Sequence, residues 1–214
     1  MIPIKVQLGS AHQAVYGGFY AAVQNGYYAR EGLDVSFITA GANTDLVSPI
    51  LDSTAQFGVM GASTLISERA ADKPLHALAI ILRRDPIVFY SLANSGIVRL
   101  QDFVGKKVLV SARLLPRLKA MLAKAQISPD KITLVSTGDA TGLYTGVVDV
   151  ASGLITSSVL AARQAGHPVN IIYPDDYGVH FYSTTIYAAD DYITSNPDLV
   201  TRFLRATLDG WAYA

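Results

Sequence analysis

The chain has 214 residues, with 17 basic and 17 acidic side chains and therefore no formal net charge. Half of the residues are hydrophobic and 16% are charged, which allows a sizeable core and excludes a disordered chain. Zero net charge argues against nucleic acid as a partner. The absence of cysteine excludes disulfides, thiolate metal sites, iron–sulfur clusters and cysteine nucleophiles. No apolar run approaches the roughly 18 residues of a membrane span.

Short apolar runs alternate with helical patterns along the whole chain. In the first half we expect strands over residues 4–8, 33–38, 57–60, 78–82 and 87–92, and helices over 16–25, 43–51 and 63–71. Asn43 or Thr44, and Ser63 or Thr64, are expected to cap two of these helices. In the second half we expect strands over 107–110, 132–135, 147–150, 169–172 and 181–187, and helices over 114–125, 141–145, 157–164 and from 197 onward.

This alternation predicts an α/β fold with mostly parallel sheets. Roughly ten strands exceed what one small sheet usually holds, so we expect two α/β lobes joined by two crossover segments. Lobe I would comprise residues 1–85 and 188–214, and lobe II residues 86–187. The first crossing is expected at Arg84-Asp85, with Pro86 starting the crossing strand.

Both ends of the sequence suggest a longer natural chain. Met1 leads straight into a strand pattern with no leader peptide, so an exported protein would have lost its leader. The amphipathic pattern of the last helix is still running at Ala214, so we expect the natural chain to continue.

Motifs of enzymes are scarce. The sequence contains no G-x-S-x-G, P-loop, strand-following G-x-G-x-x-G or H-E-x-x-H motif. The four histidines are not at metal-ligand spacing. The adjacent acidic pairs at 175–176 and 190–191 are typical of solvated turns, because neighbouring side chains point apart. We therefore predict no catalytic residue, no metal site and no cofactor.

Small polar clusters recur where a predicted strand ends and a helix begins. They occupy residues 10–13, 41–44, 61–64, 111–113, 136–138 and 153–156. Helix capping accounts for any one of them, but six together favour a shared ligand-binding cleft at the carboxyl ends of the strands. The residues expected to contact the ligand are Ser10, His12, Gln13, Tyr16, Asn43, Gly61, Ser63 and Thr64 in the first lobe, Ser111, Thr137, Gly138 and Thr156 in the second, and Arg84, Tyr177 and Tyr182 near the crossovers.

The same clusters favour a neutral or weakly charged flat heterocycle over a compact anion. The first-lobe clusters contain no Lys or Arg, and Arg113 is the only basic residue in the second-lobe clusters. Aromatic side chains such as Tyr16 and Tyr182 could stack on a ligand, although core packing would explain them equally well. Arg113, Arg117 and Lys124 share one face of a predicted helix, which indicates a solvated face or a docking patch.

Seven segments follow one another in an order typical of a known family. Residues 26–35 have the sequence GYYAREGLDV, and residues 203–211 have the sequence FLRATLDGW. The other segments are 12–22, 55–59, 100–108, 146–150 and 176–182. Together they resemble solute-binding proteins of the thiamine-pyrimidine precursor and nitrate–sulfonate–taurine type.

This resemblance implies the type II periplasmic binding protein fold, in which two α/β lobes close on a ligand. Members bind thiamine pyrimidines, riboflavin, nitrate, sulfonates or taurine. Two positions depart from the pyrimidine binders: Ser10 stands where they tend to carry Trp, and residues 156–158 stand where many carry Asn-Glu-Pro. The pyrimidine synthases of this superfamily use a cysteine-rich motif, so the chain is not expected to be an enzyme.

The leading hypothesis is non-catalytic binding of a small molecule, favouring a pyrimidine- or flavin-like heterocycle, with delivery to an ABC importer from a periplasmic or extracytoplasmic location. Three alternatives stay open. The chain could be the extracytoplasmic sensing domain of a membrane kinase or cyclase, a binder of a small anion such as sulfonate or nitrate, or an enzyme that uses the same cleft. The expected partners are the small molecule and either an ABC permease or a fused signalling domain.

Overall fold

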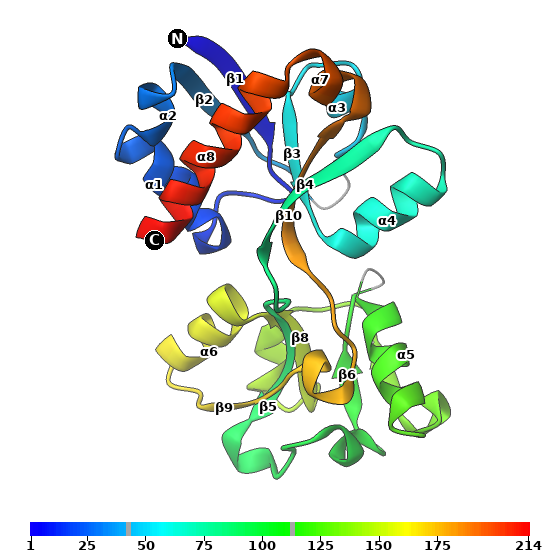
Figure 1. Cartoon of the computed structure of the whole chain (residues 1–214). Helices are drawn as coiled ribbons and strands as arrows, with labels where there is room; N and C mark the ends of the chain where they lie inside the picture. The colour runs from blue at the N-terminus through cyan, green and yellow to red at the C-terminus, as the bar shows by residue number, and fades with distance from the viewer. Residues whose placement is uncertain (42–43, 112–113) are drawn as a thin grey trace. The chain divides into compact units, whose positions relative to one another are not determined.

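The computed structural model describes residues 1–41, 44–111 and 114–214. The chain divides into two compact units, the first formed by Met1–Arg83 and Phe181–Ala214 and the second by Arg84–His180. The boundary near residue 84 lies close to the expected first crossing. The chain passes back to the first unit between residues 180 and 181 rather than between 187 and 188, because residues 183–189 form a strand of the first sheet. Each unit contains one five-stranded sheet with helices on its faces (Figure 1).

The sheet of the first unit has the strand order β2-β1-β3-β10-β4. Its strands are β1 (Ile2–Gln7), β2 (Leu33–Ile38), β3 (Phe57–Met60), β4 (Leu75–Leu82) and β10 (Ser183–Ala189). Strand β1 runs parallel to β2 and β3, whereas β10 runs antiparallel to β3 and β4. The alternating apolar residues of β1 and the continuous apolar run of β3 both suit strands with buried faces.

Helices cover both faces of this sheet. Helices α1 (Gly17–Gln24), α2 (Tyr27–Arg30) and α8 (Pro197–Tyr213) pack on one face, and α3 (Ser48–Leu51) and α4 (Ala62–Ala70) on the other, while α7 (Asp190–Ser195) connects β10 to α8. The Phe203 ring stacks on Phe57 of β3 at 3.8 Å and on Tyr28 of α2 at 5.6 Å between centroids. The buried Tyr28 hydroxyl contacts Thr207 Oγ1 at 2.8 Å, and burial raises the pKa of Tyr28. These contacts fix α2 and α8 over the sheet.

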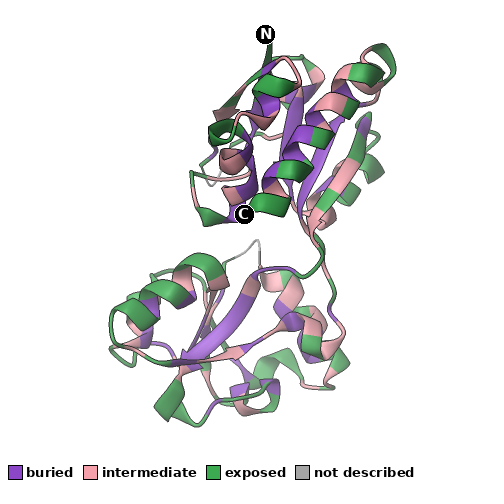
Figure 2. Ribbon diagram, turned by 60° about the vertical axis from the view of Figure 1, so that its left-hand side comes forward, coloured by how far each residue is buried: buried purple, intermediate pink, exposed green. Residues whose placement is uncertain are grey.

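The sheet of the second unit has the strand order β7-β6-β8-β5-β9. Its strands are β5 (Ile87–Leu92), β6 (Lys107–Leu109), β7 (Thr133–Val135), β8 (Val150–Leu154) and β9 (Val169–Ile172). Strand β6 is parallel to β7 and β8, and β5 is antiparallel to β8 and β9. Helices α5 (Leu115–Lys124) and α6 (Leu160–Gln164) flank it, and the strand β5 is buried while the helices expose their outer faces (Figure 2).

Three expectations about these elements were wrong. The sheets are mixed rather than mostly parallel, because β5 and β10 each run antiparallel to both neighbours. The helix expected over 43–51 is only α3, because Asp45 Oδ1 accepts hydrogen bonds from the amides of Val47 and Ser48 just before it. Strand β8 begins three residues later than expected, because the amides of Val147 and Val148 are held in a turn by the Gly142 carbonyl.

A buried ion pair lies at the start of the second unit. Asp85, which precedes β5, pairs with Arg117 of α5, and their side chains are only 8% and 12% exposed. Asp85 Oδ1 also accepts a hydrogen bond from the Ile87 amide at 3.1 Å. Burial raises the pKa of the Asp85 carboxyl, and the Arg117 charge opposes that rise. The sequence pattern indicated a solvated face or a docking patch on α5, but Arg117 on that face is buried in an ion pair.

Removing one member of this pair is expected to leave the other charge buried without its partner. We expect Asp85→Ala to lower the free energy of unfolding by about 3 kcal/mol, the usual cost of breaking a buried pair. Asp198→Ala is the matched control, since Asp198 is 83% exposed in its pair with Arg202, and should change stability by less than about 0.5 kcal/mol. Urea denaturation of both variants measures the difference. If both variants lowered the free energy of unfolding equally, the buried Asp85–Arg117 pair would contribute no more to stability than the exposed pair.

Candidate functional site

The polar clusters of the first unit meet at one edge of its sheet. Because β1, β2 and β3 are mutually parallel, the segments that follow them leave from the same edge. The segments after β1 and β2 are joined by a hydrogen bond from the Ala40 amide to the Ser10 carbonyl at 3.1 Å. The end of β3 is close as well, since a Cβ on Gly9 would lie 2.8 Å from the Val59 carbonyl oxygen. Asn43 lies outside the described residues.

Ser10 is the centre of a hydrogen-bonded cluster at this edge. Its Oγ lies 2.9 Å from the Tyr16 hydroxyl and 3.3 Å from the Ala11 carbonyl oxygen, and it accepts a hydrogen bond from Gln13 Nε2. Tyr16 is only 5% exposed, so its ring belongs to the core, while Ser10 and Gln13 are half-buried. The structure therefore brings three of the expected site residues into direct contact.

His12 belongs to a second pair of side chains beside this cluster. Its Nδ1 lies 2.9 Å from the Tyr20 hydroxyl, and the two rings are tilted with centroids 5.6 Å apart. Burial raises the pKa of Tyr20, and a hydrogen bond from the Gln13 main chain acts in the opposite direction. Tyr20 was not among the expected site residues. Its place among the aromatic residues that follow the polar cluster at 10–13 was the signal that could have revealed it.

The start of α4 forms the third part of the edge, and here the capping prediction was wrong. Gly61 is the N-cap, and no side chain caps the helix. The Ala62 amide donates to the Tyr182 carbonyl, while Ser63 and Thr64 lie in the first turn. Among the described residues neither hydroxyl has a hydrogen-bond partner, and both residues are half-buried. Both hydroxyls are therefore available to a ligand.

The second unit carries a comparable edge. Strands β6, β7 and β8 are parallel, so Ser111, Thr137 and Gly138 follow strands that end on the same side. Residues 153 and 154 belong to β8 itself, and Thr156 lies in a π-helix, Ile155–Val159, between β8 and α6. Ser111, Thr137, Gly138 and Thr156 are all exposed. Among the described residues of these edge segments in both units, none is Lys or Arg.

Arg84 is committed to acidic partners within the second unit. Its Nη2 lies 2.6 Å from Asp176 Oδ1, its Nε lies 3.5 Å from Asp175 Oδ2, and its guanidinium carbon sits 3.9 Å above the Tyr173 ring. His180 pairs with the other oxygen of Asp175. The acidic pair at 175–176 lies in a short turn, Pro174–Tyr177, as expected, and it also pairs with Arg84.

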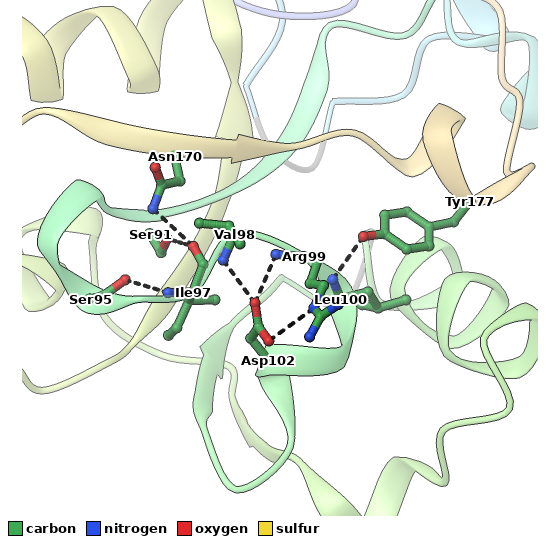
Figure 3. A network of polar contacts seen from close by, with 9 residues as sticks. All are labelled: Ser91, Ser95, Ile97, Val98, Arg99, Leu100, Asp102, Asn170 and Tyr177. Atoms are coloured by element: carbon green, nitrogen blue, oxygen red, sulfur yellow. Dashed lines mark hydrogen bonds and ion pairs between the residues drawn. The ribbon is translucent and has the colours of Figure 1, made fainter.

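Tyr177 has a structural partner as well. Its hydroxyl accepts a hydrogen bond from the Leu100 amide at 2.8 Å, beside the Asp102 carboxylate that accepts from the amides of Val98 and Arg99 (Figure 3). Tyr177 therefore anchors the connection between β5 and β6. Tyr182, half exposed, lines a pocket of about 470 Å³ along β4 together with Arg83. Of the residues expected near the crossovers, Tyr182 contacts the edge through its main-chain carbonyl, which accepts from the Ala62 amide. Among the described residues, Arg84 and Tyr177 pair with other segments of the second unit instead.

A helix long and apolar enough to cross a membrane is not found among the described residues. Within the same residues, no three His, Asp or Glu side chains come together in a way that could hold a metal ion.

Two mixed five-stranded sheets, each with polar segments at the carboxyl ends of its parallel strands, define a protein of the periplasmic binding protein fold. The aliphatic sulphonate binding protein SsuA of Escherichia coli has this fold and superposes with a TM-score of 0.78 at 16% identity, covering 99% of this chain and 73% of that one. Residues 13–214 match the NMT1/THI5-like family, and the chain belongs to that family.

Curated relatives carry names that point to more than one activity. A formylaminopyrimidine-binding protein of Halalkalibacterium halodurans is 26% identical over 98% of this chain and 66% of its own length. The riboflavin-binding protein RibY of Chloroflexus aurantiacus is 25% identical over 92% and 58%. A 4-amino-5-hydroxymethyl-2-methylpyrimidine phosphate synthase of Legionella pneumophila is 27% identical over 90% and 63%. The chain thus spans about two thirds or less of each relative's length.

The close approach of Gly9 to β3 yields a prediction about this edge. Gly9→Ala is expected to destabilise the protein by about 1–3 kcal/mol, because the new Cβ would lie 2.8 Å from a backbone oxygen that cannot swing away. Gly17→Ala is the control, since no atom lies within 4 Å of its added Cβ and its φ is −50°. That change should leave stability unaltered or raise it by up to about 1 kcal/mol. Thermal and urea unfolding of the two variants give the comparison, and a silent Gly9→Ala would contradict the described packing.

Proposed function

We propose that the chain binds a small neutral or weakly charged heterocycle through the polar carboxyl edges of its sheets. Binding would leave the ligand chemically unchanged, and the chain would deliver it to an ABC importer from an extracytoplasmic location. The residues proposed to contact the ligand are Ser63 and Thr64 with His12 and Gln13 in the first unit, and Ser111, Thr137, Gly138 and Thr156 in the second.

The observation that carries the ligand class is that the described residues of the edge segments include no Lys or Arg, while Arg113 lies outside the described residues. A compact anion is usually held by a positioned Arg or Lys that lacks an internal partner. Arg84 is paired with Asp175 and Asp176, and Arg117 is paired with Asp85. The described edge segments offer hydroxyls, an amide and an imidazole instead. These groups suit the polar rim of a flat heterocycle better than a sulfonate or a nitrate ion.

The names of two relatives support the same class, because formylaminopyrimidines and riboflavin are both flat nitrogen heterocycles. A third relative is named as a synthase. In this chain the absence of cysteine and the pairing of His12 with Tyr20 favour binding over catalysis. A sensing role, with the same fold coupled to a membrane kinase or cyclase, would use the same ligand-binding edges.

A ligand screen tests the proposal directly. Riboflavin, 4-amino-5-hydroxymethyl-2-methylpyrimidine, ethanesulfonate and nitrate are added to the protein, and unfolding is followed by differential scanning fluorimetry. A true ligand at about 100 times its Kd should add about 2.7 kcal/mol of stability. We expect one of the two heterocycles to do so, with recovery of the unaltered ligand after incubation.

Salt dependence separates the two ligand classes. The Kd of a neutral heterocycle should change by less than about twofold between about 0.05 M and about 0.5 M sodium chloride, because screening acts on charge pairs. Stabilisation by ethanesulfonate or nitrate alone, weakening steeply with salt, would show that the chain binds an anion and that the proposed class is wrong.

A further inference from the structure

The hydrogen-bonding capacity of the Ser10 hydroxyl is fully used within the protein. A hydroxyl donates one hydrogen bond and accepts two. The Ala11 carbonyl can only accept, so Ser10 donates there, and Gln13 Nε2 can only donate. The remaining partner, the Tyr16 hydroxyl at 2.9 Å, must then donate to Ser10. Ser10, which the sequence places among the ligand contacts, has no hydrogen bond left for a ligand.

Gln13, in contrast to Ser10, has hydrogen-bonding groups that are not used within the described residues. Its side chain is held by Ser10, and its backbone is extended, with φ −161° and ψ 167°. One N–H of its amide is used by Ser10. Among the described residues, the second N–H and Oε1 have no partner, and the residue is only half-buried. Gln13 therefore offers one donor and one acceptor on an amide whose orientation is fixed.

We propose that the Gln13 amide recognises a heterocycle edge on which a hydrogen-bond donor and an acceptor are adjacent, with Ser10 and Tyr16 as the positioning residues. This inference rests on the proposed function. A 4-aminopyrimidine presents such an edge, with an exocyclic N–H beside a ring nitrogen. The isoalloxazine ring of a flavin presents another, with the N3–H beside a carbonyl oxygen. An oriented amide pairs with either edge, and a site built for these bonds rejects analogues that lack them.

Methylated analogues test the contact without altering the protein. In 3-methylriboflavin the N3–H is replaced by a methyl group, and 4-dimethylamino-2-methylpyrimidine lacks the exocyclic N–H of 4-amino-2-methylpyrimidine. By isothermal titration calorimetry, the unaltered protein should bind the parent compound at least about tenfold more tightly than its methylated partner. The pair is chosen to match the heterocycle that stabilises the protein in the ligand screen.

Variants of Gln13 then assign this discrimination to a residue. Gln13→Ala and the nearly isosteric Gln13→Glu should both reduce the preference for the parent compound to about twofold or less, since neither supplies an amide N–H. Gln24→Ala, an exposed change at the end of α1, is the control and should keep the full preference. Thermal unfolding midpoints close to that of the unaltered protein show that the variants are folded.

The positioning role of Ser10 has its own readout. Ser10→Ala keeps the Gln13 amide but removes the group that holds it, so the preference for the parent compound should fall while binding of the methylated analogue stays within about twofold. A loss of binding for both compounds alike would show that Ser10 acts only on the structure of the edge and would overturn this role.

The outcomes distinguish recognition by Gln13 from the more general proposal that the chain binds a heterocycle. If the unaltered protein binds neither heterocycle, the proposed function is wrong and the inference falls with it. If it binds one of them and Gln13→Ala keeps both affinity and preference, then the proposed function stands and the assignment to Gln13 is wrong.

Discussion

The insertion of β10 between β3 and β4 is the constraint on which the first unit depends. Strand β4 reaches the rest of its sheet only through β10, which pairs Thr185 with Met60 on one side and with Ile80 on the other. The insertion is tight, because the Tyr187 ring lies against Gly58, where an added Cβ would come within 2.2 Å of the ring. Just before β10, the Tyr182 carbonyl accepts a hydrogen bond from the Ala62 amide, which fixes the start of α4 at the polar edge.

Two arginines of the second unit are paired with carboxylates of the same unit. They are Arg84, which the sequence places near the expected site, and Arg117 of α5. Their charges therefore stabilise the segments around β5, and the described residues of the polar edge segments include no Lys or Arg. Because burial of the Asp85–Arg117 pair is favourable only while both members are present, the pair constrains the sequence without offering a site for an anion.

The sequence predicts most of the strands and long helices, because their apolar periodicity is strong, as in β2, β3 and β9. It does not predict the antiparallel crossovers, since the partner of a buried strand leaves no mark on that strand's own pattern. It also locates the polar residues at the carboxyl ends of the parallel strands. It could not separate Ser10 from Gln13, because that difference depends on which hydrogen bonds the folded chain has already formed. The pairing of Tyr177 with the Leu100 amide was hidden for the same reason.

Unused hydrogen-bonding capacity is a stricter guide to ligand contacts than polarity. Ser10 and Tyr16 are polar and lie at the right edge, yet their bonds serve to orient Gln13. Ser63, Thr64 and Gln13 keep unpaired donors and acceptors among the described residues, in positions that are half-buried. Half-burial matters, since a ligand that covers these groups must replace the water it removes with equivalent hydrogen bonds, or binding becomes unfavourable. An amide held in one orientation by Ser10 meets that requirement best with a ligand whose polar atoms are also fixed in one plane, as they are in a heteroaromatic ring.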